Sequence, residues 1–301
     1  MFRVQDYLAE SGIPYSASGK NIGVGWVGVQ CPACGDSKNH CGIAPTGYSY
    51  TCFKCGTKGS MQSLIQQLSG VGWKAAKELF NQYNDSLYFN DIANRNRNVS
   101  EVLLPQNITA RLPELHTNYL VDRNFDPEYI KRMFNVQSVY HTGEWKYRLI
   151  IPVYMHGKLV TYVGRDVSGQ SETKYKNLRS DLSILTTKEA VYNIDNIHEE
   201  AIICEGPTDV WRFGYNAVAM FGLIYTQDQV RILGNKLKKA TICFDNEPHA
   251  QEVASNLAEE LSWQGVEVEI ILIDAADPGE LSKAEADEIK NELYGDVRHL
   301  A

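Results

Sequence analysis

The sequence has no run of about eighteen apolar residues, the length typical of a membrane-spanning helix. It also lacks a basic-then-apolar leader, because it opens with the mixed, polar stretch "MFRVQDYLAE". No internal repeat and no low-complexity tract is present. We therefore expect no membrane partner and a cytoplasmic location.

Length and composition allow packed cores. A chain of 301 residues suggests about two domains, and its 44% of hydrophobic residues is enough to fill them. Seven cysteines in a chain without a leader favour metal binding or ordinary burial over a disulfide framework.

Positive charge is scarce overall, since the net charge is −8, and this argues at first against a nucleic-acid-binding protein. The charge is unevenly spread, however. Residues 1–199 hold 21 Lys and Arg against 18 Asp and Glu, whereas residues 200–301 hold 8 against 19. So acidic a segment repels phosphate unless divalent cations intervene. Solvated helix faces such as "AEADEIKNE" account for many of these acids without any function.

The chain divides by composition into four segments. Residues 1–80 hold a cysteine cluster and then "GSMQSLIQQLSG", which predicts a short helix ended by Gly70. Residues 81–100 are rich in Asn and weakly periodic, which is typical of a linker. Compact patterning returns over residues 101–199, and we expect a further domain over residues 200–301.

The third segment predicts helices followed by a hairpin. Helical patterning covers residues 112–135. The apolar runs "RLIIPVYM" and "KLVTYVGRD" come next, and we expect them to pair as a hairpin that turns at His156-Gly157.

The last hundred residues alternate strand and helix patterns. We expect strands in "AIICEG", "AVAMFG", "KATICFDNE" and "VEVEIILI", with a helix after each of the first three. The second helix would be capped by Thr226 and the third ended by Gly265. This alternation predicts a largely parallel sheet with helices on its faces.

Acidic residues follow three of these expected strands. Ligands gather at the carboxyl ends of parallel strands, so these side chains should meet at one edge of the sheet. Carboxylates that meet repel one another unless they bind hard cations, and oxygen ligands suit magnesium or manganese. Any one of them could instead cap the helix that follows it. They are Glu205 and Asp209 after the first strand, Asp245 and Glu247 after the third, and Asp274, Asp277 and Glu280 after the fourth.

Two Cys-x2-Cys pairs, "CPACG" and "CFKCG", lie seventeen residues apart near the start of the chain. This spacing is typical of a structural zinc ribbon with one zinc ion per chain. His40 and Cys41 lie between the pairs and could replace a ligand, but four cysteines already complete a tetrahedral site. Cys204 and Cys243 lie in apolar strands and are interpreted as small core residues. The four expected ligands are Cys31, Cys34, Cys52 and Cys55.

The acids at the strand ends resemble the TOPRIM domain shared by DnaG-type primases, topoisomerases and some nucleases. The marks of that domain are a Glu after the first strand and an acid-x-acid pair after a later one, which here are Glu205 and "DNE" at 245–247. Two positions depart from the usual pattern. Glu247 stands where Asp is commoner, and Gly279 stands where the DnaG-type pattern prefers an acid.

The order of a zinc ribbon, a basic middle and a TOPRIM sheet is similar to that of DnaG-type primases. The segments "YLVDRNFDPEYIKRMF", "YRLIIPVYMHGKLVTYVGRD" and "TKYKN" resemble the polymerase-core segments of bacterial and phage primases. Within the family, "CPACGDSK", "CEGPTDV" and "FDNEP" most resemble the stand-alone primase subunits of T-even-type phages. The resemblance covers about 25–285. It implies a mixed α/β protein with a small antiparallel zinc ribbon, then a primase RNA-polymerase core with a TOPRIM α/β sheet.

The resemblance also implies an activity, the template-directed synthesis of short RNA primers on single-stranded DNA from ribonucleoside triphosphates. Catalysis would use Mg²⁺ or Mn²⁺, beside the structural Zn²⁺. Without the family context, the alternative for Arg165 and Lys174 is a solvated hairpin edge. The implied catalytic residues are Glu205, Asp245 and Glu247, which with Asp209 and Asp277 are the implied metal ligands, while Arg165, Lys174 and Tyr175 would bind nucleotide phosphates or template.

The sequence has no G-x-x-x-x-G-K-[ST] phosphate loop, so it does not resemble a fused primase-helicase and implies a separate replicative helicase as partner. The zinc ribbon of this family helps to select the initiation site. Tyr48, Tyr50 or Phe53 could stack on unpaired bases there, or their rings could cover the core of the small domain. The implied setting is a bacterial cell that is infected by a phage or carries a prophage.

Two alternatives stay open at this stage. One is another TOPRIM enzyme, a nuclease or a topoisomerase, although a topoisomerase needs a tyrosine nucleophile in a large strand-passage gate. The other is a non-catalytic zinc-ribbon protein that binds single-stranded DNA, against which the acids after three strands argue.

Overall fold

The computed structural model describes residues 2–45, 47–83 and 99–295. They form two compact units. The first comprises the described residues up to Tyr83 together with Glu259–Val266, and the second comprises the remaining described residues. The linker expected over 81–100 falls largely on residues 84–98, which lie outside the described residues. The domain boundaries therefore stay predictions.

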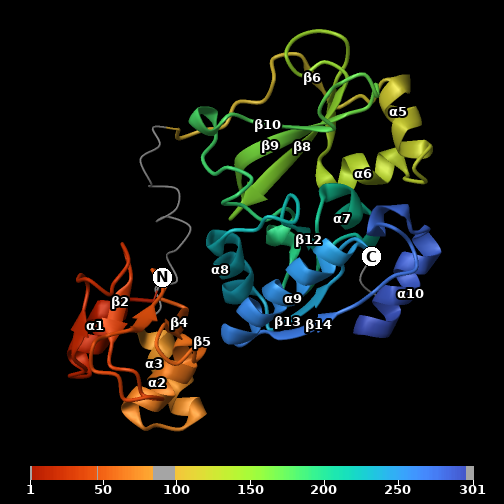
Figure 1. Cartoon of the computed structure of the whole chain (residues 1–301). Helices are drawn as coiled ribbons and strands as arrows, with labels where there is room; N and C mark the ends of the chain where they lie inside the picture. Colours follow the sequence, from red (N-terminus) through yellow and green to blue (C-terminus); the bar gives the residue numbers. More distant parts are fainter. Residues whose placement is uncertain (1, 46, 84–98, 296–301) are drawn as a thin grey trace. The chain divides into compact units, whose positions relative to one another are not determined.

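The first unit is built around an antiparallel sheet in the order β1-β2-β3-β4-β5. Its helices are α1 (Val4–Glu10), α2 (Met61–Ser69) and α3 (Trp73–Tyr83). The strands are β1 (Tyr15–Ser16), β2 (Val27–Val29), β3 (Cys41–Ile43), β4 (Ser49–Cys52) and β5 (Lys58–Ser60). Figure 1 shows these strands and helices in red to orange.

The expected helix α2 is confirmed, with its end at the expected glycine. The Ser63 N–H donates to the Ser60 hydroxyl at 3.0 Å and caps the start. Gly70 takes a left-handed conformation with φ of 66° and ends the helix. The sequence did not lead us to expect α1 and α3. Phe2, just before α1, stacks on Phe80 of α3 with ring centroids 5.0 Å apart.

The second unit contains an antiparallel sheet in the order β10-β9-β8-β7-β6. The expected hairpin is confirmed: β8 (Arg148–Met155) pairs with β9 (Lys158–Asp166) across a turn at His156 and Gly157, whose φ angles are 53° and 74°. Two positive φ angles match the twist of a tight hairpin. The other strands are β6 (Ile108–Thr109), β7 (Gln137–Val139) and β10 (Tyr175–Asn177).

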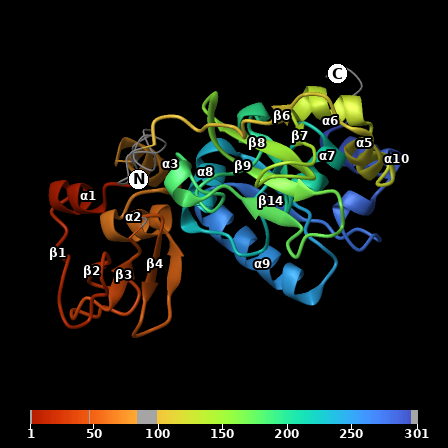
Figure 2. The same ribbon diagram turned by 90° about the horizontal axis from the view of Figure 1, so that it is seen from above.

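Helices α5 (Glu114–Val121) and α6 (Pro127–Phe134) lie within the region expected to be helical, between β6 and β7 in the chain. They lie side by side in both ribbon views (Figures 1 and 2). Asp126 caps α6 by accepting from the Glu128 N–H at 2.9 Å.

A second sheet of the same unit is parallel throughout, in the order β12-β11-β13-β14, as the alternating pattern predicted. Its strands are β11 (Glu200–Cys204), β12 (Ala217–Ala219), β13 (Lys239–Ile242) and β14 (Glu267–Ile270). The helices are α7 (Pro207–Phe213), α8 (Gln227–Lys236), α9 (Pro248–Trp263) and α10 (Lys283–Tyr294), with short 3-10 turns η1 (Ser180–Leu182), η2 (Ile194–Asn196) and η3 (Pro278–Glu280).

The ends of these helices follow the sequence signals. Thr226 accepts from the Gln229 N–H at 3.3 Å at the start of α8, and Gly265 has a φ of 85° just after α9. Cys204 and Cys243 are fully buried, as expected of small core residues.

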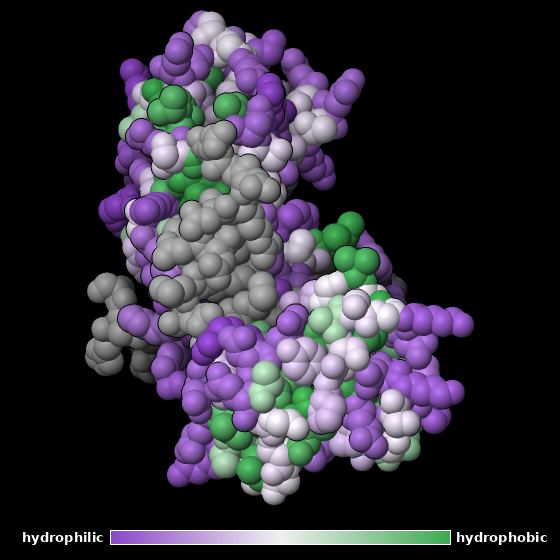
Figure 3. Space-filling view, turned by 90° about the vertical axis from the view of Figure 1, so that its left-hand side faces the viewer, coloured by the Kyte–Doolittle hydropathy of each residue, from purple (hydrophilic) through white to green (hydrophobic). Residues whose placement is uncertain are grey.

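The described residues form no helix long and apolar enough to cross a membrane. The face drawn in Figure 3 is mostly hydrophilic, with hydrophobic residues in small groups.

Candidate functional site

The acidic residues that follow three strands of the parallel sheet line one cavity. Glu205 follows β11, Asp245 follows β13, and Asp277 follows β14 at the start of η3. The cavity has a volume of about 460 Å³. Its other acidic residues are Asp209 and Glu280.

Burial and mutual repulsion raise the pKa of the Glu205, Asp209 and Asp245 carboxyl groups. Burial, with added repulsion from Glu205 and Asp277, raises the pKa of Asp245 to about 7. Burial also raises the pKa of Glu205, although the Asp245 N–H donates to Glu205 Oε1 at 3.0 Å and favours its charged form. A cavity that raises the pKa of several acids in this way favours either protons or cations.

Asp209 is both a helix cap and a residue of the cavity. Its Oδ2 accepts from the Gly206 N–H at 2.8 Å at the start of α7, so the helix-capping alternative holds for this residue. Its side chain is buried, and burial raises its pKa to about 7. Its Oδ1 accepts from the Thr208 hydroxyl at 3.4 Å.

Glu247, expected among the metal ligands, is exposed and is not among the residues that line the cavity. Its N–H donates to the Asp245 carbonyl at 2.8 Å. The carboxylate is still close enough to raise the pKa of both Glu205 and Asp245 by repulsion. Its role stays a prediction. Asp274, the remaining acid of this set, is also exposed and outside the cavity lining.

Gly279, the departure from the DnaG-type pattern, has a steric cause in this chain. A Cβ at position 279 would lie 2.9 Å from Asp277 Oδ1 and 3.1 Å from Asp209 Oδ1. A side chain at this position would require the Asp277 carboxyl group, and to a lesser extent that of Asp209, to shift. The glycine thus keeps the loop close to the acids.

Basic and aromatic side chains line another part of the same cavity. Arg165 and Tyr175 are paired across β9 and β10, and Lys174 directly precedes Tyr175. The guanidinium of Arg165 lies between two aromatic rings, 4.7 Å from the ring centroid of Tyr175 and 5.6 Å from that of Tyr119. The structure therefore brings together all three basic-segment residues expected from the sequence.

Arg123, which the sequence reasoning missed, also lines the cavity. Its guanidinium lies 6.0 Å from the ring centroid of Tyr119, so one ring contacts two cations. Buried polar atoms without a hydrogen-bond partner gather here: Arg123 Nε, Arg165 Nε, the Tyr119 and Tyr175 hydroxyls, and Asp277 Oδ1. Two guanidiniums beside one ring, with unsatisfied polar atoms around them, fit a polyanionic ligand.

The carboxylates suit a hydrated cation better than a closed metal cage. In the part of the chain that the structure describes, only the four N-terminal cysteines form a group of three or more ligand residues whose atoms lie within 4.8 Å of one another. Magnesium is usually held by one or two carboxylates and keeps several waters. The chemistry and wider spacing of Glu205, Asp245 and Asp277 therefore fit Mg²⁺ or Mn²⁺.

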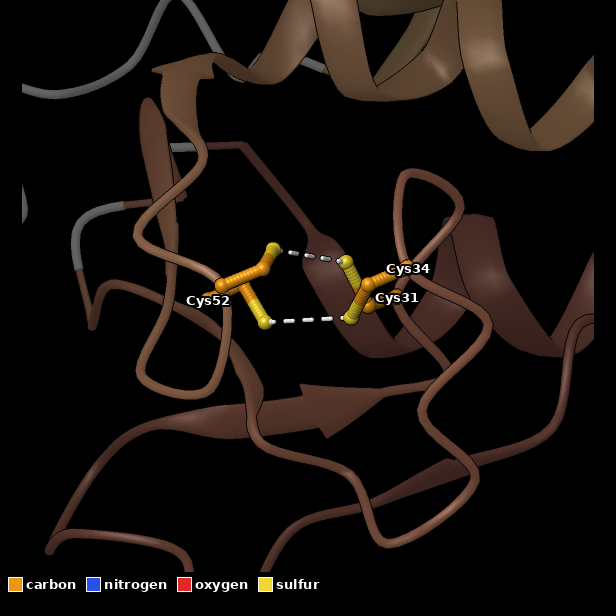
Figure 4. Close-up of side chains that lie close together, drawn as sticks. Cys31, Cys34 and Cys52 are labelled. Atoms are coloured by element: carbon orange, nitrogen blue, oxygen red, sulfur yellow. Dashed lines mark hydrogen bonds between the residues drawn. The ribbon is translucent and has the colours of Figure 1, made fainter.

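The four cysteines fit a tetrahedral zinc ion. Cys31 Sγ lies 3.8 Å from Cys55 Sγ, and Cys34 Sγ lies 3.9 Å from Cys52 Sγ. Zinc-sulfur bonds of about 2.3 Å place two ligands of a tetrahedron about 3.8 Å apart. Figure 4 shows the sulfur atoms facing one another from two turns of the chain.

His40 is bound to Asp36, and Cys41 is outside the group of four cysteines whose sulfur atoms lie together, so neither replaces a cysteine ligand. His40 Nδ1 lies 2.9 Å from Asp36 Oδ2, and Lys54 Nζ donates to Asp36 Oδ1 at 3.0 Å. Cys41 is fully buried, and burial raises the pKa of its thiol. Asp36 thus connects the two cysteine turns, since Lys54 lies between Cys52 and Cys55.

The proposed stacking aromatics separate into two groups. Tyr48 and Tyr50 are buried in the core of the first unit, so the expectation that they contact bases is wrong and the alternative that they cover the core holds. Phe53 is 65% exposed and lies edge-on to Trp26, with ring centroids 5.7 Å apart.

Comparisons with known proteins agree with this architecture. Residues 202–282 match the Toprim-like family. A DNA primase of Halalkalibacterium halodurans is 22% identical over 92% of this chain, which spans 56% of that protein's length. An uncharacterized protein of Mycoplasma genitalium is 30% identical over 53% of this chain and 74% of its own length.

The zinc-binding and RNA-polymerase domains of the Aquifex aeolicus primase have the same fold, with a TM-score of 0.50 and 19% identity over 96% of this chain and 82% of that one. The expected fold class is thereby confirmed, with a zinc-ribbon unit followed by a core that contains a TOPRIM sheet.

Proposed function

Because the chain belongs to the DnaG-type TOPRIM primase family, we propose that it synthesises short RNA primers on single-stranded DNA for replication. The observation that carries this proposal is the cavity of the second unit. It combines five acidic side chains, suited to divalent cations, with Arg123, Arg165 and Lys174, suited to phosphates. A metal-bound nucleoside triphosphate presents both kinds of group to a protein.

The reaction forms a bond between the 3′-oxygen of one ribonucleotide and the α-phosphorus of the next, and breaks the bond from that phosphorus to pyrophosphate. Glu205 and Asp245 would hold Mg²⁺ or Mn²⁺, and Asp209, Asp277 and Glu247 would complete the acidic surroundings. Two divalent ions, when bound, lower the pKa of the attacking oxygen and spread the charge of the leaving group.

The basic side of the cavity would hold the triphosphate. Arg165 offers a planar fork of donors held between two tyrosine rings, while Lys174 is exposed and acts as a mobile point charge. Arg123 is a third phosphate ligand in this proposal. Tyr175 orients Arg165 rather than binding the substrate through its ring.

The zinc ribbon would contact the template. Four lysines and a single acid, Asp36, occur in residues 15–60, and that acid is buried and bound by Lys54. The segment therefore carries a net charge of +3 in a chain whose net charge is −8, and Lys20 and Lys38 are the lysines outside the ion pairs with Asp36 and Glu259. Phe53 and Trp26 offer rings for stacking on unpaired bases. One Zn²⁺ per chain would maintain the fold of this segment.

The finer assignments are proposals as well. Ribonucleoside triphosphates would be the substrates, and a separate replicative helicase the partner. The segments "CPACGDSK", "CEGPTDV" and "FDNEP" support a relation to the stand-alone primases of T-even-type phages. A chain of that kind would act in the cytoplasm of a phage-infected or prophage-bearing bacterium.

An assay of product type tests the proposal. The protein is incubated with labelled ribonucleotides, Mg²⁺ and single-stranded templates of mixed sequence, and the products are separated by size. We expect short RNA. Cleaved or relaxed DNA without RNA would instead indicate a nuclease or topoisomerase, and template binding without any new product would indicate a non-catalytic binding protein.

A further inference from the structure

One buried guanidinium connects the chain segments that form the cavity. Arg212 lies on α7 and is 2% exposed. Its Nη2 donates to the carbonyls of Arg123 at 2.8 Å and Gly279 at 3.0 Å, and its Nη1 donates to the carbonyl of Asn124 at 3.1 Å. The three acceptors belong to the loop after α5 and to η3, far from α7 in the sequence.

Each bonded segment carries a residue of the cavity. The loop after α5 carries Arg123, and η3 follows Asp277 and contains Gly279, while the start of α7 carries Asp209. Gly279 lies directly beside the Asp277 and Asp209 carboxyl groups, because a Cβ there would contact both. A bond that holds the Gly279 carbonyl therefore holds the backbone that lies beside the two acids.

The interaction is specific to arginine. Nη2 reaches one carbonyl in each of the two loops and Nη1 reaches a third, whereas lysine has a single nitrogen on a different stem and would lose at least the bond to Asn124. The ring of Phe125 lies 4.2 Å from the guanidinium carbon and holds its plane. Phe125 in turn packs edge-on against Trp211 on α7, with centroids 5.9 Å apart.

Burying the charged guanidinium of Arg212 costs folding free energy, which a purely stabilising role does not explain. Burial lowers the pKa of Arg212, and the nearby Arg123 lowers it further. Its Nε has no hydrogen-bond partner among the described residues. A buried cation that donates to carbonyls rather than to a carboxylate is weak support for stability in itself.

We propose that Arg212 is a positioning residue, which sets the distance between the phosphate-binding Arg123 and the acidic pair Asp209 and Asp277 without touching the substrate. It acts on both halves of the cavity at once, since its bonds end in both loops. Loss of these hydrogen bonds would let η3 move independently of the loop that follows α5. Small displacements of this kind lower catalytic rates by about 100-fold.

The first test needs no catalytic activity. Amide hydrogen exchange is compared between the wild type and Arg212→Lys in the full chain, with Arg231→Lys on α8 as the control for a buried arginine outside the cavity. We expect faster exchange in residues 122–126 and 277–281 of Arg212→Lys, and no change there in Arg231→Lys. Unchanged exchange in both segments of Arg212→Lys would overturn the proposal.

The second test depends on the proposed primer synthesis. Arg212→Lys should lower kcat about 100-fold with a smaller rise in nucleotide KM.

In Arg212→Ala, added guanidinium ion should restore part of the rate, because it can fill the vacated site. If thermal melting shows that Arg212→Lys and Arg212→Ala are both unfolded, Phe125→Leu replaces them as the test variant. It keeps the three hydrogen bonds of Arg212 but removes the ring that holds the guanidinium in its plane. Full kcat in a folded Arg212 variant would contradict a positioning role. So would a loss of kcat no greater than that of Arg231→Lys at an equal fall in melting temperature. If the wild type makes no primers, the exchange experiment still decides.

Discussion

At the scale of single residues, buried carboxyl groups control the electrostatics of the cavity. Asp209 and Asp245 both have a pKa raised to about 7, and in both cases burial is the largest cause. Each ionised group therefore destabilises the metal-free protein and gains most from a bound cation. Binding and stability are linked through the same atoms.

Asp209→Asn should stabilise the metal-free protein in alkaline solution. The pKa of about 7 in the folded protein lies above the usual value of 3.8, so ionisation of Asp209 lowers the free energy of unfolding. This loss is absent below about pH 4, grows up to about pH 7 and is constant above it. Asn keeps an oxygen that can accept from the Gly206 N–H. We expect a gain of about 2–4 kcal/mol in the free energy of unfolding at pH 8, which vanishes towards pH 4.

Urea unfolding at a series of pH values, with chelator present, measures this gain. Asp126→Asn at the exposed cap of α6 is the control and should not stabilise the protein at any pH. A gain for Asp209→Asn that is the same at pH 4 and pH 8 would show that its charge is not the cause.

Glu247 gives a second prediction at this scale, because its exposure leaves two roles possible. If it coordinates an ion, Glu247→Asp should lose magnesium-supported primer synthesis by about tenfold and regain part of it with manganese, whose geometric demands are looser. Glu247→Gln should be poorer with both ions, and Asp245→Asn inactive. Primer yield against the concentration of each metal decides this, and near-normal magnesium dependence in Glu247→Gln removes Glu247 from the metal site.

The sequence located some site residues and missed others for a physical reason. Glu205 and Asp245 were predictable, since a carboxylate directly after an apolar strand has few structural uses. Arg123 and Arg212 were not, because in a sequence a functional or buried arginine on or beside a helix looks the same as a solvated one. Only the fold shows that the ring of Tyr119 lies beside two guanidiniums.

At the scale of elements, strand ends and one short loop build the cavity. The strands and helices of the parallel sheet were predictable from their alternating pattern and end signals, and so was the hairpin of β8 and β9. Helices α1 and α3 were not anticipated, since their short amphipathic patterns gain meaning only when they pack together. Gly279 looked like a defect in the sequence, whereas the structure shows that a Cβ there would lie against the carboxyl groups of Asp277 and Asp209.

Gly279→Ala should therefore impair the site without changing the fold. The added Cβ would lie 2.9 Å from Asp277 Oδ1 and force this carboxyl group to shift. Overpacking of this kind costs about 1–3 kcal/mol, and the altered spacing of the acids should raise the Mg²⁺ concentration needed for half-maximal primer yield by about tenfold. Gly72→Ala, where a Cβ meets nothing within 4 Å, is the matched control. Equal magnesium requirements in both variants would contradict this account of the loop.

At the scale of the whole molecule, the two units hold two candidate metal sites of different chemistry, four thiols in the first and carboxylates in the second. The first depends on its cysteines, because a unit with a small core relies on structural zinc for about 10 kcal/mol of folding free energy. The second has extended sheets and cores of its own and holds all the residues of the cavity. The zinc ribbon and the catalytic site should thus be separable by mutation.

Cys52→Ser should unfold the first unit and spare the second. We expect the loss of bound zinc by elemental analysis, and fast amide exchange up to residue 83 with normal protection in β11 and β13. Sequence-specific initiation should be lost with the first unit. Well under one zinc per wild-type chain would refute the zinc assignment, and loss of protection in β11 would show that the units do not fold separately.

The central claim is that the cavity of the second unit joins ribonucleotides, and mass analysis of the products tests it most directly. Wild type and Glu205→Gln are each incubated with a single-stranded template, ribonucleoside triphosphates and Mg²⁺, and template affinity is measured in parallel. The account predicts short RNA complementary to the template from the wild type, and none from Glu205→Gln at unchanged template affinity. Equal RNA yield from the two proteins would contradict it.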